Sequence, residues 1–251
     1  MFARTRKAGA LAVLTGCAAV LALSGCYVDP GQQLKHRAHT YPVSPPVHTL
    51  VISNRVGDVQ VTGGAGRVSV TERIRYRHQL PQTTHAVRAG TLTLTGDCPV
   101  SQACDVEYHV RVPPGTTVRI DDRVGNVRLT ALTGQVSART GAGGIDLRSL
   151  SGAVQARENA GSISGSDISS ATSTMNTNVG SIDVSFSAAP AAVAAATTIG
   201  SISLRLPRGV AYTVHASTGV GTIHVTVPRA ASSAHSITVR TGTGSITIQP
   251  T

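Results

Sequence analysis

Short runs of alternating apolar and polar residues follow one another along the chain from Val47 onward. Examples are "HTLVIS" at 48–53, "RVSVTERIRY" at 67–76 and "VEYHVRV" at 106–112. A period of two places every second side chain against a core, and no segment sustains the 3.6-residue period of an amphipathic helix. The pattern predicts an all-β domain over residues 47–251, which is long enough to bury one continuous core.

Glycines divide these strands into repeats. They recur every nine residues from Gly125 to Gly161, each followed two positions later by a β-branched residue. Two positions further on, leucine alternates with alanine, so the full unit is eighteen residues long. A coil that turns back and stacks about 4.8 Å from the coil before it requires such a unit. The repeat therefore predicts a β-solenoid over 125–168, with these residues facing inward: Val127, Leu129, Ile145, Leu147, Val154 and Ile163.

The glycines have a second interpretation, a phosphate-binding loop. Such a loop needs Gly-x-Gly-x-x-Gly followed by a helix, and it occurs once in a domain. Here the pattern repeats and no helical pattern follows, so we interpret the glycines as corners and expect no cofactor. Looser copies begin at Gly180, Gly200, Gly221 and Gly244, at spacings of 20, 21 and 23 residues, which indicates coils that lengthen toward the C-terminus.

The N-terminus has the layout of an export signal. A short basic region precedes an uncharged stretch over 8–25, and "LSGC" at 23–26 resembles the lipobox of bacterial lipoproteins. We expect residues 1–25 to be a lipoprotein signal peptide, Cys26 to be the lipidation site and 26–46 to be a flexible tether. The protein would then be extracytoplasmic and lipid-anchored to the outer face of the cell membrane. An uncleaved membrane helix or a simple secretory peptide are the alternatives.

The composition is basic, with 22 Lys and Arg against 12 Asp and Glu. Removing residues 1–25 takes away three basic residues and no acidic one, so the net charge falls from +10 to +7. Lys35 is then the only lysine, and the abundance of Arg, Ala, Gly and Val indicates a GC-rich, actinobacterial genome. Because aromatic residues make up only 3% and tryptophan is absent, nucleic acid is not the expected partner. The expected partners are anionic cell-wall polymers, lipid headgroups or an envelope protein.

Repeated Gly-Ser/Asp/Asn-Ile/Val-x-Leu/Val units, "VRVPPG" at 110–115 and "LRLPRGVAYTV" at 204–214 carry a family resemblance. The chain resembles the bacterial putative-adhesin family of unknown function over most of residues 47–251. That resemblance implies an exported protein with a right-handed β-helix-like or two-sheet repeat fold and no known catalytic residues.

Two further groups bear on metal binding. Cys98 and Cys104 should form a disulfide in an oxidising compartment, whereas a two-thiolate metal site would lack further ligands at workable spacing. His36, His39 and His48 lie in or beside the tether, where we interpret them as solvated side chains. We therefore expect no metal site.

Asp121 and Asp122 are the candidates for catalysis. Adjacent residues in a strand point to opposite faces, so the pair could converge on a substrate only from a turn. We assign them a turn or solvated-edge role. The expected function is a non-catalytic, adhesin-like or structural binding module at the cell envelope, and the alternative is a carbohydrate-active β-helix enzyme acting on anionic polysaccharide.

Arginine rows are the candidate anion-binding residues. The eighteen-residue register stacks Arg139 on Arg157, and we expect no acidic side chain one coil away to neutralise them. The alternative is an ordinary solvated face. The full candidate set is Arg73, Arg75, Arg77, Arg139, Arg148 and Arg157.

Overall fold

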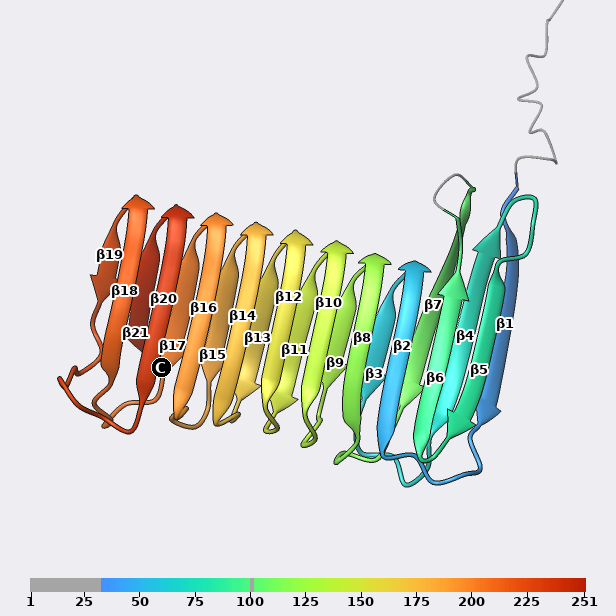
Figure 1. Ribbon diagram of the computed structural model, residues 1–251, viewed down its shortest axis with the longest axis horizontal. Coiled ribbons are helices and arrows are strands. Elements are labelled where there is room, and N and C mark those ends of the chain that lie inside the picture. The colour runs from blue at the N-terminus through green and yellow to red at the C-terminus, as the bar shows by residue number, and fades with distance from the viewer. Residues whose placement is uncertain (1–32, 100–101) are drawn as a thin grey trace, which may run out of the picture. The chain divides into compact units, whose positions relative to one another are not determined.

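A computed structural model describes residues 33–99 and 102–251, which form two β-sheets and no helix (Figure 1). The all-β prediction is confirmed. Side chains from both sheets meet in a single hydrophobic core, so the sheets pack face to face. No helix in this part of the chain is long and apolar enough to cross a membrane.

One sheet has eleven strands. In spatial order they are β1 (Lys35–Pro42), β4 (Ser69–Tyr76), β7 (Cys104–Arg111), β3 (Val59–Thr62), β9 (Val127–Thr130), β11 (Ile145–Leu150), β13 (Ile163–Ile168), β15 (Ile182–Phe186), β17 (Ile202–Leu206), β21 (Ile246–Pro250) and β19 (Ile223–Val225).

The other sheet has ten strands. In spatial order they are β18 (Thr213–Val220), β20 (Ser236–Thr243), β16 (Ala192–Ile199), β14 (Thr172–Val179), β12 (Val154–Ala160), β10 (Val136–Ala142), β8 (Thr117–Val124), β2 (Thr49–Val56), β6 (Thr91–Asp97) and β5 (Gln82–Arg88). Strands pair in parallel except at β1–β4, β4–β7 and β5–β6.

Most strands belong to a repeated two-strand unit, called a coil below, which consists of one strand of the ten-stranded sheet, a glycine corner and the next strand of the eleven-stranded sheet. Ile145 on β11 is the register partner of Ile163 on β13, eighteen residues later, and Leu129 is the partner of Leu147. These residues are all buried. The predicted register over 125–168 and its inward-facing residues are therefore confirmed.

The last coils do not stack in chain order. β20 lies between β16 and β18, and β21 lies between β17 and β19 (Figure 1). The β18–β19 coil thus lies two positions from the β16–β17 coil, and the β20–β21 coil, although later in the chain, lies between them. The prediction that successive coils lengthen toward the C-terminus is therefore wrong. The corner at Gly244 contacts those at Gly200 and Gly221, so the spacings of 20, 21 and 23 residues do not measure coils stacked in chain order.

Corner glycines are required by both conformation and space. Gly143 and Gly180 have φ angles of 136° and 148°, a region that residues with a β-carbon rarely adopt. A β-carbon at Gly180 would also overlap the carbonyl oxygen of Gly161 in the preceding coil. The close stacking of corners therefore depends on glycine.

Part of the expected tether is a strand. Residues 35–42 form β1, which pairs antiparallel with β4, so the assignment of a tether through residue 46 is wrong for this segment. Nearly every side chain of β1 is exposed, and its apolar pattern is correspondingly absent from the sequence. Backbone pairing, rather than burial, holds it in place. Cys26 and the signal segment 1–25 lie outside the described residues.

Cys98 and Cys104 form the predicted disulfide, with an S–S distance of 1.97 Å. Cys98 directly follows β6 and Cys104 begins β7, so the bond closes the connection between a strand of each sheet.

A candidate anion-binding face

Two arginines stand side by side on the outer face of the ten-stranded sheet. Arg139 on β10 is the register partner of Arg157 on β12, and both side chains are exposed. Parallel neighbours lie about 4.8 Å apart along the stacking direction. The predicted stacking of these two residues is confirmed.

The row of exposed side chains that contains Arg139 and Arg157, called the arginine column below, also contains an acidic residue. Asp121 on β8 is the register partner of Arg139 on the side away from Arg157, so the expectation of no acidic neighbour is wrong. Asp121 precedes Arg139 by one eighteen-residue unit because β8 already belongs to the regular series. Arg157 has Asn176 as its other neighbour. No salt bridge to either arginine occurs within residues 33–99 and 102–251.

Two depressions flank this column, with volumes of about 250 and 410 Å³. Asp121, Arg139 and Arg157 line both, so the column forms a ridge between two hollows. The rest of the lining includes uncharged polar side chains, namely Ser137, Gln155, Asn159, Asn176 and Asn178. Guanidinium, amide and hydroxyl donors of this kind suit carboxylate, sulfate or phosphate groups.

Two other candidates lie on the eleven-stranded sheet and already have acidic partners. The Nη2 atom of Arg148 lies 2.9 Å from an oxygen of Asp146. Arg75 donates to Asp105 and Glu107, each at 2.9 Å. Since carboxylates occupy these donors, neither arginine is equivalent to Arg139 or Arg157.

The remaining pair belongs to the region of β4. Arg73 is exposed on that strand, and Arg77 is half-buried directly after it. The Nε atom of Arg77 is buried without a hydrogen-bond partner in the described part of the chain. The structure therefore separates Arg73, Arg75 and Arg77 from Arg139 and Arg157, on different sheets.

The two candidate catalytic carboxylates face opposite ways. Asp121 and Asp122 lie in β8, inside the ten-stranded sheet between β10 and β2, so their assignment to a turn or an edge is wrong. Asp121 is exposed, whereas Asp122 is only 1% exposed. Burial, with a contribution from the charge of Asp58, raises the pKa of Asp122 to about 7. The pair cannot act on one substrate.

Asp122 belongs to a column of polar side chains that sequence reasoning missed, all of them buried except the half-buried Thr218. Its members lie three residues before each corner glycine, at Asn54, Asp122, Thr140, Glu158, Thr177, Thr197, Thr218 and Thr241. The threonine hydroxyls donate to a corner carbonyl of a neighbouring coil, as Thr197 does to Gly180 at 3.0 Å and Thr241 to Gly200 at 2.9 Å. The sequence signal for this column is the recurrence of threonine three residues before a corner glycine.

Glu158 occupies a threonine position in this column. It is buried, and it accepts a hydrogen bond from Thr177 at 3.3 Å. Burial raises its pKa to about 7. The folded protein therefore holds a proton on Glu158 at higher pH than the unfolded chain does.

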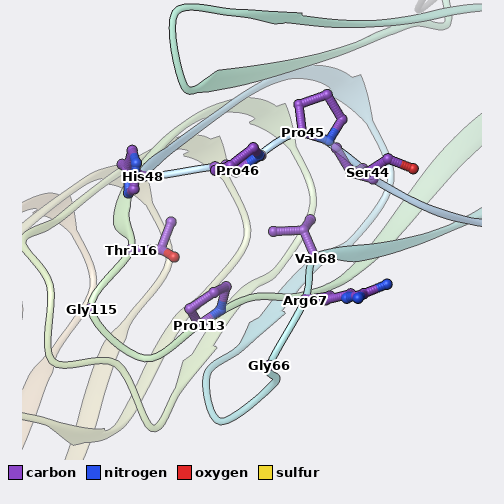
Figure 2. A pocket seen from close by; sticks show the side chains of 12 residues that line it. Ser44, Pro45, Pro46, His48, Gly66, Arg67, Val68, Pro113, Gly115 and Thr116 are labelled. Atoms are coloured by element: carbon purple, nitrogen blue, oxygen red, sulfur yellow. The ribbon is translucent and has the colours of Figure 1, made fainter.

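A larger cavity of about 610 Å³ opens among the connections that precede β2, β4 and β8 (Figure 2). Valine, proline and glycine provide most of its walls, and none of the Asp, Glu or Cys residues in 33–99 and 102–251 lines it. Ser44 and His48 stand at opposite sides of the opening with Pro45 and Pro46 between them (Figure 2). The cavity therefore offers no Ser–His pair of the kind that nucleophilic catalysis requires.

No family profile matches the sequence, and no curated protein matches it. Several solved structures are similar to this chain. In three of them the similarity covers 86% of this chain. A putative cell adhesion protein from Clostridium sporogenes is 12% identical, is covered over 100% of its length and has a TM-score of 0.38. A putative adhesin from Bacteroides fragilis is 15% identical, with 97% covered and a TM-score of 0.44. Another from Parabacteroides distasonis is 12% identical, with 97% covered and a TM-score of 0.32.

Proposed function

We propose that this chain is an exported lipoprotein whose β-solenoid domain is a non-catalytic, adhesin-like binding module at the cell envelope. The outer face around Arg139 and Arg157 holds anionic polymers or headgroups. The observation that carries the proposal is the register pairing of these two exposed arginines on adjacent parallel strands.

The electrostatics of the column favour an anion. Like charges about 5 Å apart repel by about 1 kcal/mol even in water, and of the two arginines only Arg139 has Asp121 as a register partner. Arg157 has Arg139 on one side and Asn176 on the other. A carboxylate, sulfate or phosphate between the guanidinium groups relieves the repulsion, and each planar guanidinium can hold it through two N–H donors.

A solenoid suits this role because it repeats one surface along its axis. The eighteen-residue register recurs on both sheets, as in Val136 with Val154 and Ile145 with Ile163. Corner glycines hold successive coils at a constant separation. Such a frame keeps charged side chains at a fixed spacing that can match the repeat of a linear polymer.

A catalytic role would need converging acid and base groups. Asp121 and Asp122 lie on opposite faces of β8, one exposed and one buried. Asp121 and Asp122 therefore cannot serve as the carboxylate pair of an enzyme acting on anionic polysaccharide, which supports a binding role.

The membrane anchor rests on the sequence around Cys26. Cys26→Ser in the full chain should leave the protein unprocessed or release it from the membrane fraction. Retention in the membrane at the mature mass would contradict lipid anchoring.

Binding is tested with soluble protein comprising residues 27–251, because every described strand and the whole core lie in 33–251. Heparin and polygalacturonate serve as sulfated and carboxylated probes, and vesicles with anionic lipids serve as the headgroup probe. Arg139→Ala with Arg157→Ala should weaken binding at low salt by about tenfold. Arg128→Ala with Arg148→Ala removes equal charge from the other sheet and should change binding less than about twofold.

Three outcomes would contradict the proposal. The wild type could fail to bind any probe at low salt, or the two double variants could weaken binding equally. Saturable cleavage of polygalacturonate, lost in Asp121→Ala, would support the enzyme instead.

A further inference from the structure

Both sheets end at the same place with an open edge. β18 is the last strand of the ten-stranded sheet and β19 is the last of the eleven-stranded sheet. Within the described residues, β18 pairs only with β20 and β19 pairs only with β21, although Tyr212, directly before β18, forms a single bridge with Arg229. The rest of each outer edge therefore has backbone groups without a strand partner among those residues. A free edge of this kind is a template for a further strand.

The core is also open between these two strands. Ile223 on β19 is 44% exposed, although its register partner Ile246, one coil further in, is 0% exposed. Val214 on β18 is half-buried, whereas its partner Ile237 is fully buried. The inward-facing residues of the last coil thus lack the layer that covers every preceding coil.

The edges at the opposite end are different. β1 carries Lys35 and Arg37, and β5 carries Arg88; charged side chains on an edge strand are a common device against strand addition. Neither β18 nor β19 contains Asp, Glu, Lys or Arg. The β18–β19 end therefore combines edge strands that lack Asp, Glu, Lys and Arg with a partly apolar surface, and Arg229 borders it only at Tyr212, before β18 begins.

We propose that this end binds the same end of a second copy, about a two-fold axis perpendicular to the sheets. β18 then pairs antiparallel with β18 of the second copy, and β19 pairs with its counterpart. A single added strand would satisfy one edge and leave the core open. A second copy supplies both edges and a matching core surface at once.

Charge favours this symmetric arrangement over a head-to-tail one. β18, which contains no Asp, Glu, Lys or Arg, meets its own copy without a contact between such charges, and the two-fold contact closes after two copies. A head-to-tail contact would expose another free end and produce an open filament. The two-fold axis also keeps both ten-stranded sheets in one layer, so both arginine faces point to the same side. The dimer itself does not depend on the proposed ligand.

Sedimentation velocity of residues 27–251 over a range of concentrations tests the dimer. Wild type should show a monomer–dimer equilibrium, and Ile223→Asp should weaken the dimer at least tenfold because the carboxylate would be buried between copies. His215→Asp changes only the outer face of β18 and should weaken the dimer without affecting the core. Thr238→Asp, at its register partner on β20, is the matched control and should dimerise like the wild type.

The folded state of each variant is checked by circular dichroism. A wild type that stays monomeric at the highest concentration overturns the proposal. So does a dimer that persists in both folded edge variants, since the contact would then lie elsewhere. Growth into species larger than dimers would contradict the two-fold axis and support a head-to-tail contact.

Discussion

Asp121 and Arg139 are register partners on the neighbouring strands β8 and β10, and both side chains are exposed on the same face. The carboxylate offsets part of the positive potential at the arginine column. Asp121→Asn should therefore strengthen binding of heparin at low salt by about threefold, the effect of one charge about 6 Å away in water. Isothermal titration at two salt concentrations would measure it.

The matched control is Asp146→Asn, which changes the net charge equally on the other sheet, where Asp146 pairs with Arg128 and Arg148. If both substitutions strengthened heparin binding equally, the affinity would depend on net charge alone and not on the position of Asp121 beside Arg139.

Core packing and surface pairing can be separated at adjacent positions of β11. Leu147 is 1% exposed and stacks on Leu129, so Leu147→Ala should lower the free energy of unfolding by about 2–5 kcal/mol. Arg148 points outward to Asp146, and Arg148→Ala should cost less than about 1 kcal/mol. Chemical denaturation of both variants tests this, and similar losses would contradict the assigned faces.

The strands over 125–168 can be predicted because the sequence there repeats in units of constant length. Leu129 and Leu147 occupy equivalent positions of an eighteen-residue unit, and this fixes both their register and their face. The order of the last coils could not be predicted in this way. The corners at Gly221 and Gly244 have equivalent sequences, and nothing local determines which of them lies beside Gly200.

Other features of the fold differ in how far the local sequence predicts them. β1 is exposed on both faces, so its sequence shows no apolar alternation. The inward position of Asp122 was readable, since it continues the alternation of Val118 and Ile120 along β8. The partners of Arg75, in contrast, come from β7, thirty or more residues away, and only the tertiary fold brings them together.

The corner at Gly180 should be intolerant of any side chain. Its φ of 148° and the contact with the Gly161 carbonyl mean that Gly180→Ala must both strain the backbone and separate two coils. We expect the free energy of unfolding to fall by more than about 2 kcal/mol. Gly144→Ala is the control, because a β-carbon there meets atoms no closer than 3.5 Å. Thermal unfolding compares the two, and an equally stable Gly180→Ala would contradict the corner geometry.

Glu158 should make the fold less stable as the pH rises. Burial raises its pKa to about 7 from an ordinary 4.5, so the folded state favours the protonated carboxyl. This contribution is complete below about pH 4.5 and is lost as the pH rises through 7. Between pH 5 and 8 the free energy of unfolding of the wild type should fall by about 1–3 kcal/mol relative to Glu158→Gln, whose neutral amide keeps a donor at every pH.

Urea denaturation at several pH values would measure this difference. Comparing the two proteins cancels the contributions of every other residue, since both proteins contain them. Asp183→Asn removes an exposed carboxylate, 2.8 Å from Arg205, and should retain the wild-type pH dependence between pH 5 and 8. Parallel curves for wild type and Glu158→Gln over this range would show that Glu158 stays ionised in the folded protein, and that its place in the threonine column does not depend on a proton.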